Sequence, residues 1–305
     1  MKKILVLGSL NMDLVTRVSM TPKVGETLLG EGLEQIPGGK GANQAVAIGK
    51  LGGQVAMLGR VGMDGFGEVL MKNLSVNGVE AYLTQAVQGP PTGVALIMVN
   101  DSGDNSIVVI PGANFALGKE DLTPAMFEGC DYLLAQLETP IETIETAFAM
   151  AKEKNVYTIL NPAPARTLSK QLIGLTDLLV PNETEFETLT GIHPDSDTHI
   201  KEGADILFKS GVKEIIITLG ENGACYVDAT GHLHYVKGHK VKAIDTTAAG
   251  DSFIGGLLYG MAMGEDVKEA MKRAVIIGAL TVTKLGAQSS LPTLKEVEDY
   301  LGGLR

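Results

Sequence analysis

Positive charge is scarce in this chain of 305 residues. Its 25 lysine and arginine residues face 36 aspartate and glutamate residues, which gives a formal net charge of −11. No run of lysine and arginine is longer than two residues. Nucleic acid is therefore not expected as a partner. An anionic ligand would have to be held locally, by helix ends, a metal ion or a single lysine.

Long apolar runs and cysteines are also scarce. Nothing approaches the ~20 consecutive apolar residues of a membrane span, and the apolar start of the chain stops at Asn11 and Asp13, which favours a strand over a signal peptide. Cys130 and Cys225 lie in apolar surroundings, where reduced core thiols are expected. These features predict a soluble, cytoplasmic protein with no membrane partner.

Several catalytic signatures are missing as well. The five histidines form no HxxxH or HExxH pattern, so a zinc site is not expected, and there is no GxSxG motif. No GxGxxG motif follows the first apolar segment, which argues against a nicotinamide-dependent dehydrogenase. The Gly39-Lys40 pair lacks both the upstream glycine and the following Ser or Thr of a Walker A loop.

The chain does contain a regular alternation of short apolar segments and longer helical patterns. This alternation predicts a doubly wound, mostly parallel α/β sheet flanked by helices, in one domain spanning residues 1–305. The expected strands are Ile4–Leu7, Val55–Leu58, Tyr132–Leu137, Val156–Leu160, Leu178–Val180 and Ile215–Thr218. The expected helices are Ala45–Leu51, a helix ending near Leu74, Ile141–Lys154, 252–263, 267–284 and Leu294–Leu301.

Two segments, about 14–36 and 92–112, break this alternation. They alternate polar and apolar residues, and Asn100–Asn105 reads as the polar turn of a hairpin. Asp101, Asp104 and Asn105 do not have the spacing of a calcium loop. We expect these segments to form a small inserted β-sheet that acts as a lid.

Polar side chains follow several of the predicted strands, and in an open α/β sheet such positions converge on one edge. They are Asn11, Asp13, Glu138, Asn161, Asn182, Glu185 and Asp251. Asn11 and Asp13 could be turn formers, but an amide and a carboxylate two residues apart suit a polyhydroxyl ligand. Asn182 and Glu185 could form a capping box or hold hydrated Mg²⁺.

The stretch Asp245-Thr-Thr-Ala-Ala-Gly-Asp251 reads as a turn of small residues that enters a helix. Uncovered N–H groups and the helix dipole would attract an anion there. Asp251 is either a helix cap or a group that acts on the acceptor of a transferred phosphate. We expect the dipole to keep Asp251 ionised near neutral pH.

Taken together, these motifs resemble the ribokinase-like (PfkB) carbohydrate kinases. Gly38-Gly-Lys-Gly-Ala-Asn43 is similar to the first signature of that family, and Asp245–Gly256 to the second. Asn182-Glu-Thr-Glu185 is similar to its NxxE motif, and the end of the chain, Gly286–Ser290, also agrees. The similarity covers essentially the whole chain in order. The sequences GGKGANQ and DTTAAGD are most similar to those of the family members that phosphorylate ribose.

The resemblance implies an ATP-dependent kinase that phosphorylates the primary 5-hydroxyl of D-ribose, with Asp251 as general base and 248–251 as anion hole. It places the sugar on Asn11, Asp13, Gly39, Lys40, Asn43, Glu138 and Asp251. It places the nucleotide at Asn182, Thr218, Gly220, Glu221, Gly223, Ala249, Gly250 and Val275. Relatives often carry His or Asn where this chain has Val275, which leaves the base preference open.

The resemblance also implies two cations and a dimer. Asn182 and Glu185 would organise Mg²⁺ through water. A monovalent cation, usually K⁺, would lie at Asp245, Thr247, Thr281, Lys284, Gly286 and Ser290. Lids of this family often pair, so a homodimer through the lid is expected. The alternatives are a kinase for 2-deoxyribose, fructose or a nucleoside, and a non-catalytic sugar or nucleotide sensor on the same fold.

Overall fold

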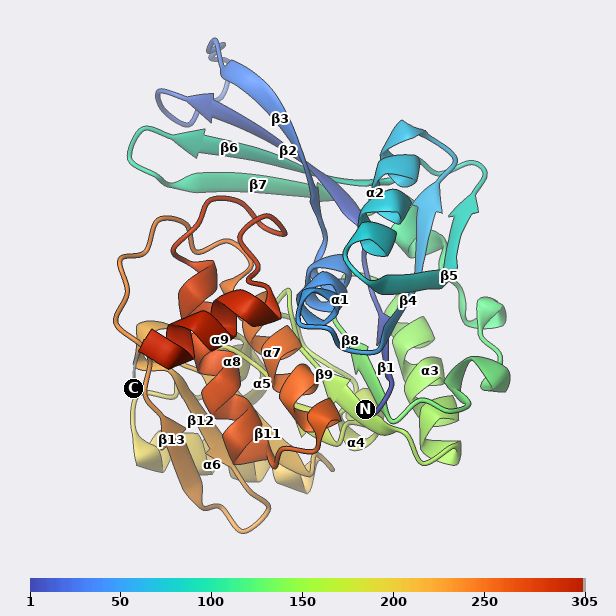
Figure 1. Ribbon diagram of the computed structural model, residues 1–305, viewed down its shortest axis with the longest axis vertical. Helices are drawn as coiled ribbons and strands as arrows, with labels where there is room; N and C mark the ends of the chain where they lie inside the picture. Colours follow the sequence, from blue (N-terminus) through green and yellow to red (C-terminus); the bar gives the residue numbers. More distant parts are fainter. Residues whose placement is uncertain (304–305) are drawn as a thin grey trace.

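The structure, a computed structural model, describes residues 1–303 and contains two β-sheets (Figure 1). The large sheet has nine strands in the order β13-β12-β11-β10-β9-β8-β1-β4-β5. Its strands are β1 (Ile4–Leu7), β4 (Val55–Gly62), β5 (Val79–Val87), β8 (Tyr132–Ala135), β9 (Tyr157–Leu160), β10 (Leu178–Leu179), β11 (Glu214–Thr218), β12 (Ala224–Val227) and β13 (Leu233–Val236).

Most neighbouring strands of the large sheet are parallel, and only the pairs β11–β12 and β12–β13 are antiparallel. Helices cover both faces, which confirms the predicted mostly parallel α/β fold. They are α1 (Lys40–Lys50), α2 (Gly65–Val76), α3 (Ile141–Glu153), α4 (Lys170–Gly174), α5 (Glu183–Thr190), α6 (Asp197–Lys209), α7 (Ala249–Met263), α8 (Val267–Thr281) and α9 (Leu294–Gly303).

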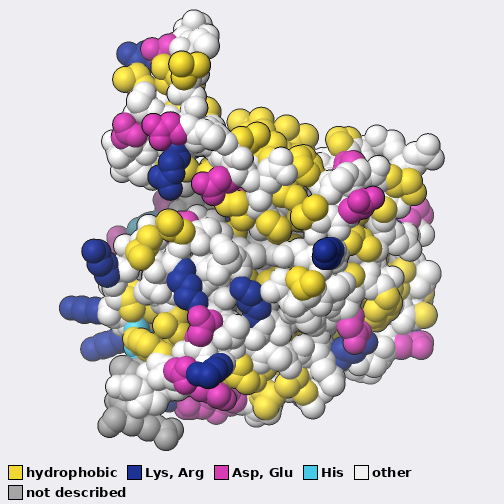
Figure 2. All heavy atoms as spheres, turned by 45° about the horizontal axis from the view of Figure 1, so that its top comes forward, with side chains coloured by type: hydrophobic (Ala, Val, Ile, Leu, Met, Phe, Trp, Pro, Cys, Tyr) yellow, Lys and Arg dark blue, Asp and Glu magenta, His cyan; other side chains and the backbone are white. Residues whose placement is uncertain are grey.

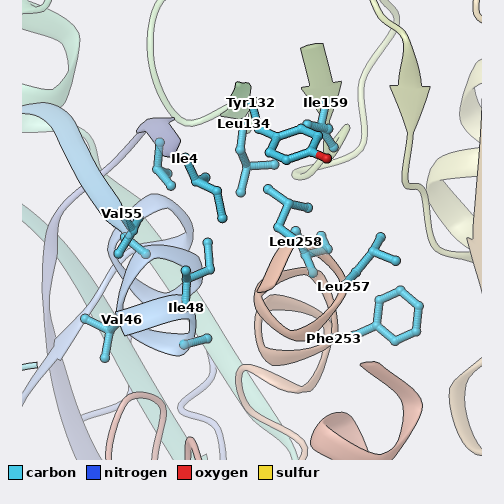
Figure 3. Close-up of a cluster of buried hydrophobic side chains, with 14 of the residues drawn as sticks. Ile4, Val46, Ile48, Val55, Tyr132, Leu134, Ile159, Phe253, Leu257 and Leu258 are labelled. Carbon is cyan, nitrogen blue, oxygen red and sulfur yellow. The ribbon is translucent and has the colours of Figure 1, made fainter. Parts of the chain in front are cut away.

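The core is divided into two layers by the large sheet. Strand β1 shows how: Ile4 and Val6 join one apolar cluster and Leu5 and Leu7 the other, because successive side chains of a strand point to opposite faces. The first cluster is closed by α1, α2, α7 and α8, and the second by α3, α4, α5 and α6. Figure 3 shows side chains of α1 and α7 meeting those of the central strands in the first layer.

The small sheet has the order β3-β2-β6-β7, with β2 (Asn11–Val18), β3 (Glu31–Gly38), β6 (Gly93–Asn100) and β7 (Asn105–Ile110). Two excursions of the chain build it: β2 leaves the large sheet after β1, and β6 leaves it after β5. Figures 1 and 2 show this sheet projecting from the main body. Residues at the base of β2 and just after β3 therefore lie where the two sheets meet.

Some local expectations were wrong. Helix α1 begins at Lys40 and not at Ala45, so the glycine-rich motif is already helical from Lys40 onward. Strand β4 continues to Gly62, beyond the expected end at Leu58. Strand β5 was not predicted, because most of its residues are exposed or half-buried and form no continuous apolar segment. Its pairing with β4 holds it in the sheet. Cys225 is buried as expected, whereas Cys130 is only half-buried.

Candidate active site

The start of α7 has the geometry expected of an anion-binding turn. Ala248, the residue before the helix, has φ 60° and ψ 13°, a left-handed conformation that is costly for a residue other than glycine. An alanine side chain cannot accept a hydrogen bond, so no capping side chain occupies the first-turn N–H groups of α7. The Ala249 N–H donates to the Thr246 carbonyl at 3.2 Å, which leaves those of Gly250 and Asp251 for a ligand. Gly250 is exposed, which keeps this part of the backbone accessible.

Asp251 lies in the first turn of α7 and is only 8% exposed. Both of its carboxylate oxygens are held by amides of α1: Asn43 Nδ2 donates to Oδ2 at 2.9 Å, and Gln44 Nε2 donates to Oδ1 at 2.9 Å. These donors come from α1 and Asp251 from α7, so the packing of the two helices creates the arrangement.

Burial raises the pKa of Asp251 above its ordinary value, although Lys40, Asn43 and Gln44 act in the opposite direction. We expected the helix dipole to keep this group ionised, and burial acts against that ionisation. The sequence could not show how completely Asp251 is desolvated, because the burial comes from packing against residues some two hundred positions earlier. Its charged state depends on the lysine and the two amides.

Asn11 and Asp13 lie at the start of β2 and are buried. Burial, together with the negative charges of Glu138 and Asp251, raises the pKa of Asp13 to about 7. Asn11 Oδ1 accepts a hydrogen bond of 2.7 Å from Asn114 Nδ2. The structure thus brings Asp13, Glu138 and Asp251 into one electrostatic cluster.

Glycine at positions 38 and 39 lets the backbone pass this cluster closely. Gly39 has φ 89°, and a Cβ there would lie 2.8 Å from the Asn11 nitrogen. A Cβ on Gly38 would lie 2.2 Å from Asp13 Oδ2. Both glycines are therefore required by space, and Gly39 also by its conformation.

Lys40 opens α1 beside the acidic cluster. Burial lowers its pKa, but the negative charges of Asp251, Glu138 and Glu185 outweigh this and raise the pKa overall. Lys40 therefore stays protonated and supplies the positive charge of the site. Glu138 Oε2 accepts hydrogen bonds from the Lys40 backbone N–H at 3.1 Å and from the Ser9 hydroxyl.

Asn182 and Glu185 form a capping box at the start of α5. Asn182 Oδ1 accepts from the Glu185 N–H at 2.8 Å, and Glu185 Oε2 accepts from the Asn182 N–H at 2.9 Å. Glu185 is buried, which raises its pKa, and Lys40 and Asp251 both act on it electrostatically. The capping interpretation is therefore correct as geometry, and Glu185 also lies close to the acidic cluster.

Four of the residues expected at the nucleotide lie at or just after the end of β11: Thr218, Gly220, Glu221 and Gly223. Thr218 ends the strand, and Gly220–Asn222 form a short 3₁₀ turn. Gly220 and Glu221 are exposed, Gly223 has φ 97°, and Leu219 N–H donates to its carbonyl at 2.8 Å. Val275 is buried in α8.

The residues expected at a monovalent cation lie in two loops that meet. Asp245 Oδ2 accepts from the Gly286 N–H at 2.8 Å, and Asp245 Oδ1 accepts from the Thr247 N–H at 2.9 Å. Thr281 ends α8, and the Lys284 side chain pairs with Glu296. Ser290 Oγ donates to the Ala287 carbonyl at 2.7 Å. The Asp245 carboxylate and the surrounding backbone oxygens are hard ligands of the type that such a cation takes.

Sequence reasoning missed Gln44, Gln136, Ser9 and Asn114 as parts of this region. Gln44, Ser9 and Asn114 each form a hydrogen bond with a predicted site residue, and Gln136 forms one with Gln44. The spacing of the sequence motifs does not indicate any of the four as a site residue. Gln44 could have been found by placing the helix start at Lys40, since Asn43 and Gln44 then share the side of α1 that faces α7.

The chain is similar to known carbohydrate kinases. The family model described as pfkB family carbohydrate kinase matches residues 1–294. A ribokinase of Haemophilus influenzae and a deoxyribokinase of Salmonella typhi are each 40% identical, over 302 and 301 residues, and 98% of both chains is covered in each comparison.

Solved structures agree with these sequence matches. The structure of Arabidopsis thaliana ribokinase complexed with ribose and ATP has a TM-score of 0.92 and 29% identity, and covers 98% of each chain. Ribokinase from Thermotoga maritima has a TM-score of 0.89 and 36% identity, and the match covers 99% of this chain and 100% of that one. The chain therefore belongs to the pfkB family of carbohydrate kinases.

Proposed function

We propose that this kinase transfers the γ-phosphoryl group of ATP to the primary 5-hydroxyl of D-ribose, giving ribose 5-phosphate and ADP. The observation that carries the proposal is Asp251: a buried carboxylate, held by two amides, in the first turn of a helix. The Ala249 N–H of that turn donates to the Thr246 carbonyl at 3.2 Å, which leaves the N–H groups of Gly250 and Asp251 for a phosphate. The similarity to ribokinases, including one solved with ribose and ATP, supports the choice of substrates.

Asp251 is the general base in this proposal. It accepts the proton of the sugar hydroxyl while that oxygen attacks the γ-phosphoryl group. The N–H groups of Gly250 and Asp251 and the Lys40 ammonium stabilise the negative charge of the transferred group. Asn11, Asp13, Asn43 and Glu138 hold the other hydroxyls, and Gly38 and Gly39 let the backbone pass close to Asp13 and Asn11.

The nucleotide is assigned to Thr218, Gly220, Glu221 and Gly223, with Val275 near the base and Ala249 and Gly250 beside the phosphates. The exposed 3₁₀ turn at Gly220 offers backbone groups to the nucleotide from the same edge of the sheet as Asp251.

Asn182 and Glu185 are assigned to Mg²⁺ through water. Within residues 1–303 there is no group of three or more His, Cys, Asp or Glu side chains arranged to hold a metal ion. Two oxygen-bearing residues at the site therefore suit an ion whose coordination is completed by water and phosphate. When bound with ATP, the ion offsets phosphate charge.

A monovalent cation, K⁺ by preference, is assigned to Asp245, Thr247, Thr281, Lys284, Gly286 and Ser290. Activation by added K⁺ after dialysis tests this assignment.

We assign residues 1–305 to one domain, with the small sheet as a lid over the sugar and as a dimer interface. The lid segments are those expected at about 14–36 and 92–112. Strand β7 and its neighbour β6 expose apolar side chains: Leu96, Ile107, Val108, Val109 and Ile110. A second copy would cover them. Gel filtration tests this assignment: a dimer is expected, and a monomer at all concentrations would contradict it.

The kinase is assigned to the cytoplasm, where its substrate ATP is available. Within residues 1–303, none of the helices combines the length and apolar character that crossing a membrane requires.

A deoxyribokinase is the second candidate, because a curated deoxyribokinase matches as well as a curated ribokinase does, at 40% identity. ADP release measured with D-ribose, 2-deoxyribose, fructose and adenosine distinguishes the candidates. We expect the highest kcat/KM with D-ribose. An inactive ribose reaction beside an active competitor would overturn the substrate, and no ADP release with any acceptor would overturn the kinase itself.

A further inference from the structure

A row of buried side-chain amides ends on the carboxylate of Asp251. Gln44 Nε2 donates to Asp251 Oδ1 at 2.9 Å and also to Asn161 Oδ1 at 3.1 Å. Gln136 Nε2 donates in turn to Gln44 Oε1 at 2.6 Å. Gln44 and Gln136 are completely buried, and Asn161 is 7% exposed. Such a set of amides inside a protein needs a function, because each amide costs free energy to desolvate.

The direction of these hydrogen bonds is determined by a backbone group. Asn161 Nδ2 donates to the carbonyl of Val180 at 3.0 Å, and a carbonyl can only accept. The Asn161 oxygen must then face Gln44, so the Gln44 NH₂ group must face Asn161 and Asp251. A reversed Gln44 amide would place its oxygen against two other oxygens. The donor that reaches Asp251 is therefore held in place by the fold.

Close packing keeps Gln44 and Asp251 together. A Cβ on Gly255 of α7 would lie 2.4 Å from Ala47 Cβ and 3.3 Å from the Gln44 carbonyl oxygen of α1, so glycine is what allows the two helices to approach. A Cβ on Gly8 would lie 2.2 Å from Gln136 Oε1. Figure 3 shows Ile48 of α1 and Leu258 of α7 in the same buried cluster.

Asn43 and Gln44 have different surroundings although both hold Asp251. Asn43 is assigned above to the sugar, and its Oδ1 accepts from Gln288 Nε2 at 3.0 Å. Gln44 uses its side-chain amide on Asp251, Asn161 and Gln136. A change at Gln44 therefore acts on the sugar reaction through Asp251.

We propose that Gln44 is a positioning residue for phosphoryl transfer: its amide holds one oxygen of the Asp251 carboxylate in the orientation that removes the proton of the sugar hydroxyl. The inference rests on the proposed role of Asp251 as base. The charged groups that face Asp251 are Lys40 from α1, Asp13 from β2, Glu138 after β8 and Glu185 from α5. Gln44 and Asn43 are the neutral side chains that donate to the Asp251 carboxylate.

The first variant is Gln44→Met, which keeps the length of the side chain and removes its hydrogen bonds. We expect kcat for ribose at pH 7 to fall about tenfold to a hundredfold, because a base displaced by part of an ångström is less effective. KM for ribose should stay within about threefold. The acidic limb of the kcat–pH profile should move to higher pH, since a donor to the anion has been lost.

The second variant is Gln44→Glu, which has the same shape but places a second carboxyl group beside Asp251. Two carboxyl groups at this distance share a proton and titrate in two steps, the upper of which lies above that of the isolated group. The acidic limb should therefore move further than in Gln44→Met, and kcat should recover as the pH is raised. Thr84→Val is the matched control: it removes a buried hydroxyl that donates to the Met57 carbonyl in β4, and should leave the kinetics unchanged.

A positioning role is contradicted if the folded Gln44 variants keep the wild-type kcat, or if kcat falls while the acidic limb stays where it is. Titration of the Asp251 carboxyl by ¹³C NMR, assigned through its loss in Asp251→Asn, provides a readout that needs no turnover. If the wild type phosphorylates no sugar, the proposed function fails. The same titration then still decides whether Gln44 acts on Asp251, since an unchanged Asp251 titration in Gln44→Glu would overturn the inference.

Discussion

The half of the site that we propose for the acceptor and the half that we propose for the nucleotide are built in different ways. The acceptor half, with Asp13, Asn43 and Asp251, is buried and cross-linked by side-chain hydrogen bonds. The nucleotide half, with Gly220 and Glu221, is an exposed turn that offers mainly backbone groups. A buried polar site rejects ligands that leave its groups unpaired, whereas a backbone turn tolerates variation in its side chains. Selectivity should therefore reside in the acceptor half.

The largest effect that this comparison predicts is at the base. Asp251→Asn keeps the size of the side chain but cannot accept the proton, so kcat should fall about a thousandfold while KM for ATP changes little. ADP release and circular dichroism on the same sample measure activity and folding. A folded variant with more than a tenth of the wild-type kcat would show that Asp251 is not the base.

The next effect concerns the cost of burying charge in the acceptor half. The pKa of Asp13 is about 7 in the folded protein and near 3.8 when unfolded, so the folded state binds the extra proton between these values. Stability without sugar should then fall as the pH rises from about 4 to 7, by up to about 4 kcal/mol. Asp13→Asn should remove this slope in urea unfolding at pH 5 and pH 8.

Glu221→Gln is the control for that measurement, because it removes an exposed carboxylate instead of a buried one. An Asp13→Asn protein with the same slope as the wild type would indicate that the burial cost lies elsewhere in the cluster.

A smaller effect separates the two roles of Asn182, which caps α5 and is proposed to organise Mg²⁺. Serine also caps helices well, so Asn182→Ser should change stability by less than about 0.5 kcal/mol. The variant lacks the amide, however, and kcat/KM for Mg-ATP should fall about tenfold. Kinetics at several Mg²⁺ concentrations measure this. Unchanged kinetics would leave Asn182 with a capping role alone.

The smallest effect is expected at the nucleotide turn itself. Glu221→Ala removes an exposed side chain and leaves the backbone turn intact, so KM for ATP should rise by no more than about threefold, with KM for ribose unchanged. If kcat/KM for Mg-ATP fell further in Glu221→Ala than in Asn182→Ser, side chains and not backbone groups would dominate nucleotide binding at this turn.

Much of the architecture could be predicted because it depends on local patterns. The continuous apolar segment Ile4–Leu7 predicts a central strand, and the small residues before Asp251 predict an open helix start. Strand β5 was missed because it depends on pairing with β4 rather than on its own sequence pattern. The contact of Gln44 with Asp251 spans 207 positions and depends on how α1 packs against α7, which no local pattern contains.

The capping box at the start of α5 was only partly predictable from the sequence. Asn182 and Glu185 were expected to be either a cap or a metal pair, and the structure shows the cap while bringing Glu185 near Lys40 and Asp251. Local spacing could describe the cap, but only the tertiary structure brings the carboxylate to the site.

The most direct test of the proposed chemistry is ³¹P NMR of a reaction containing the wild-type protein, ATP, Mg²⁺, K⁺ and D-ribose. We predict that ADP and ribose 5-phosphate appear in equal amounts, and that neither appears at a comparable rate with Asp251→Asn. Release of inorganic phosphate without a phosphorylated sugar, or phosphorylation at another hydroxyl, would contradict it.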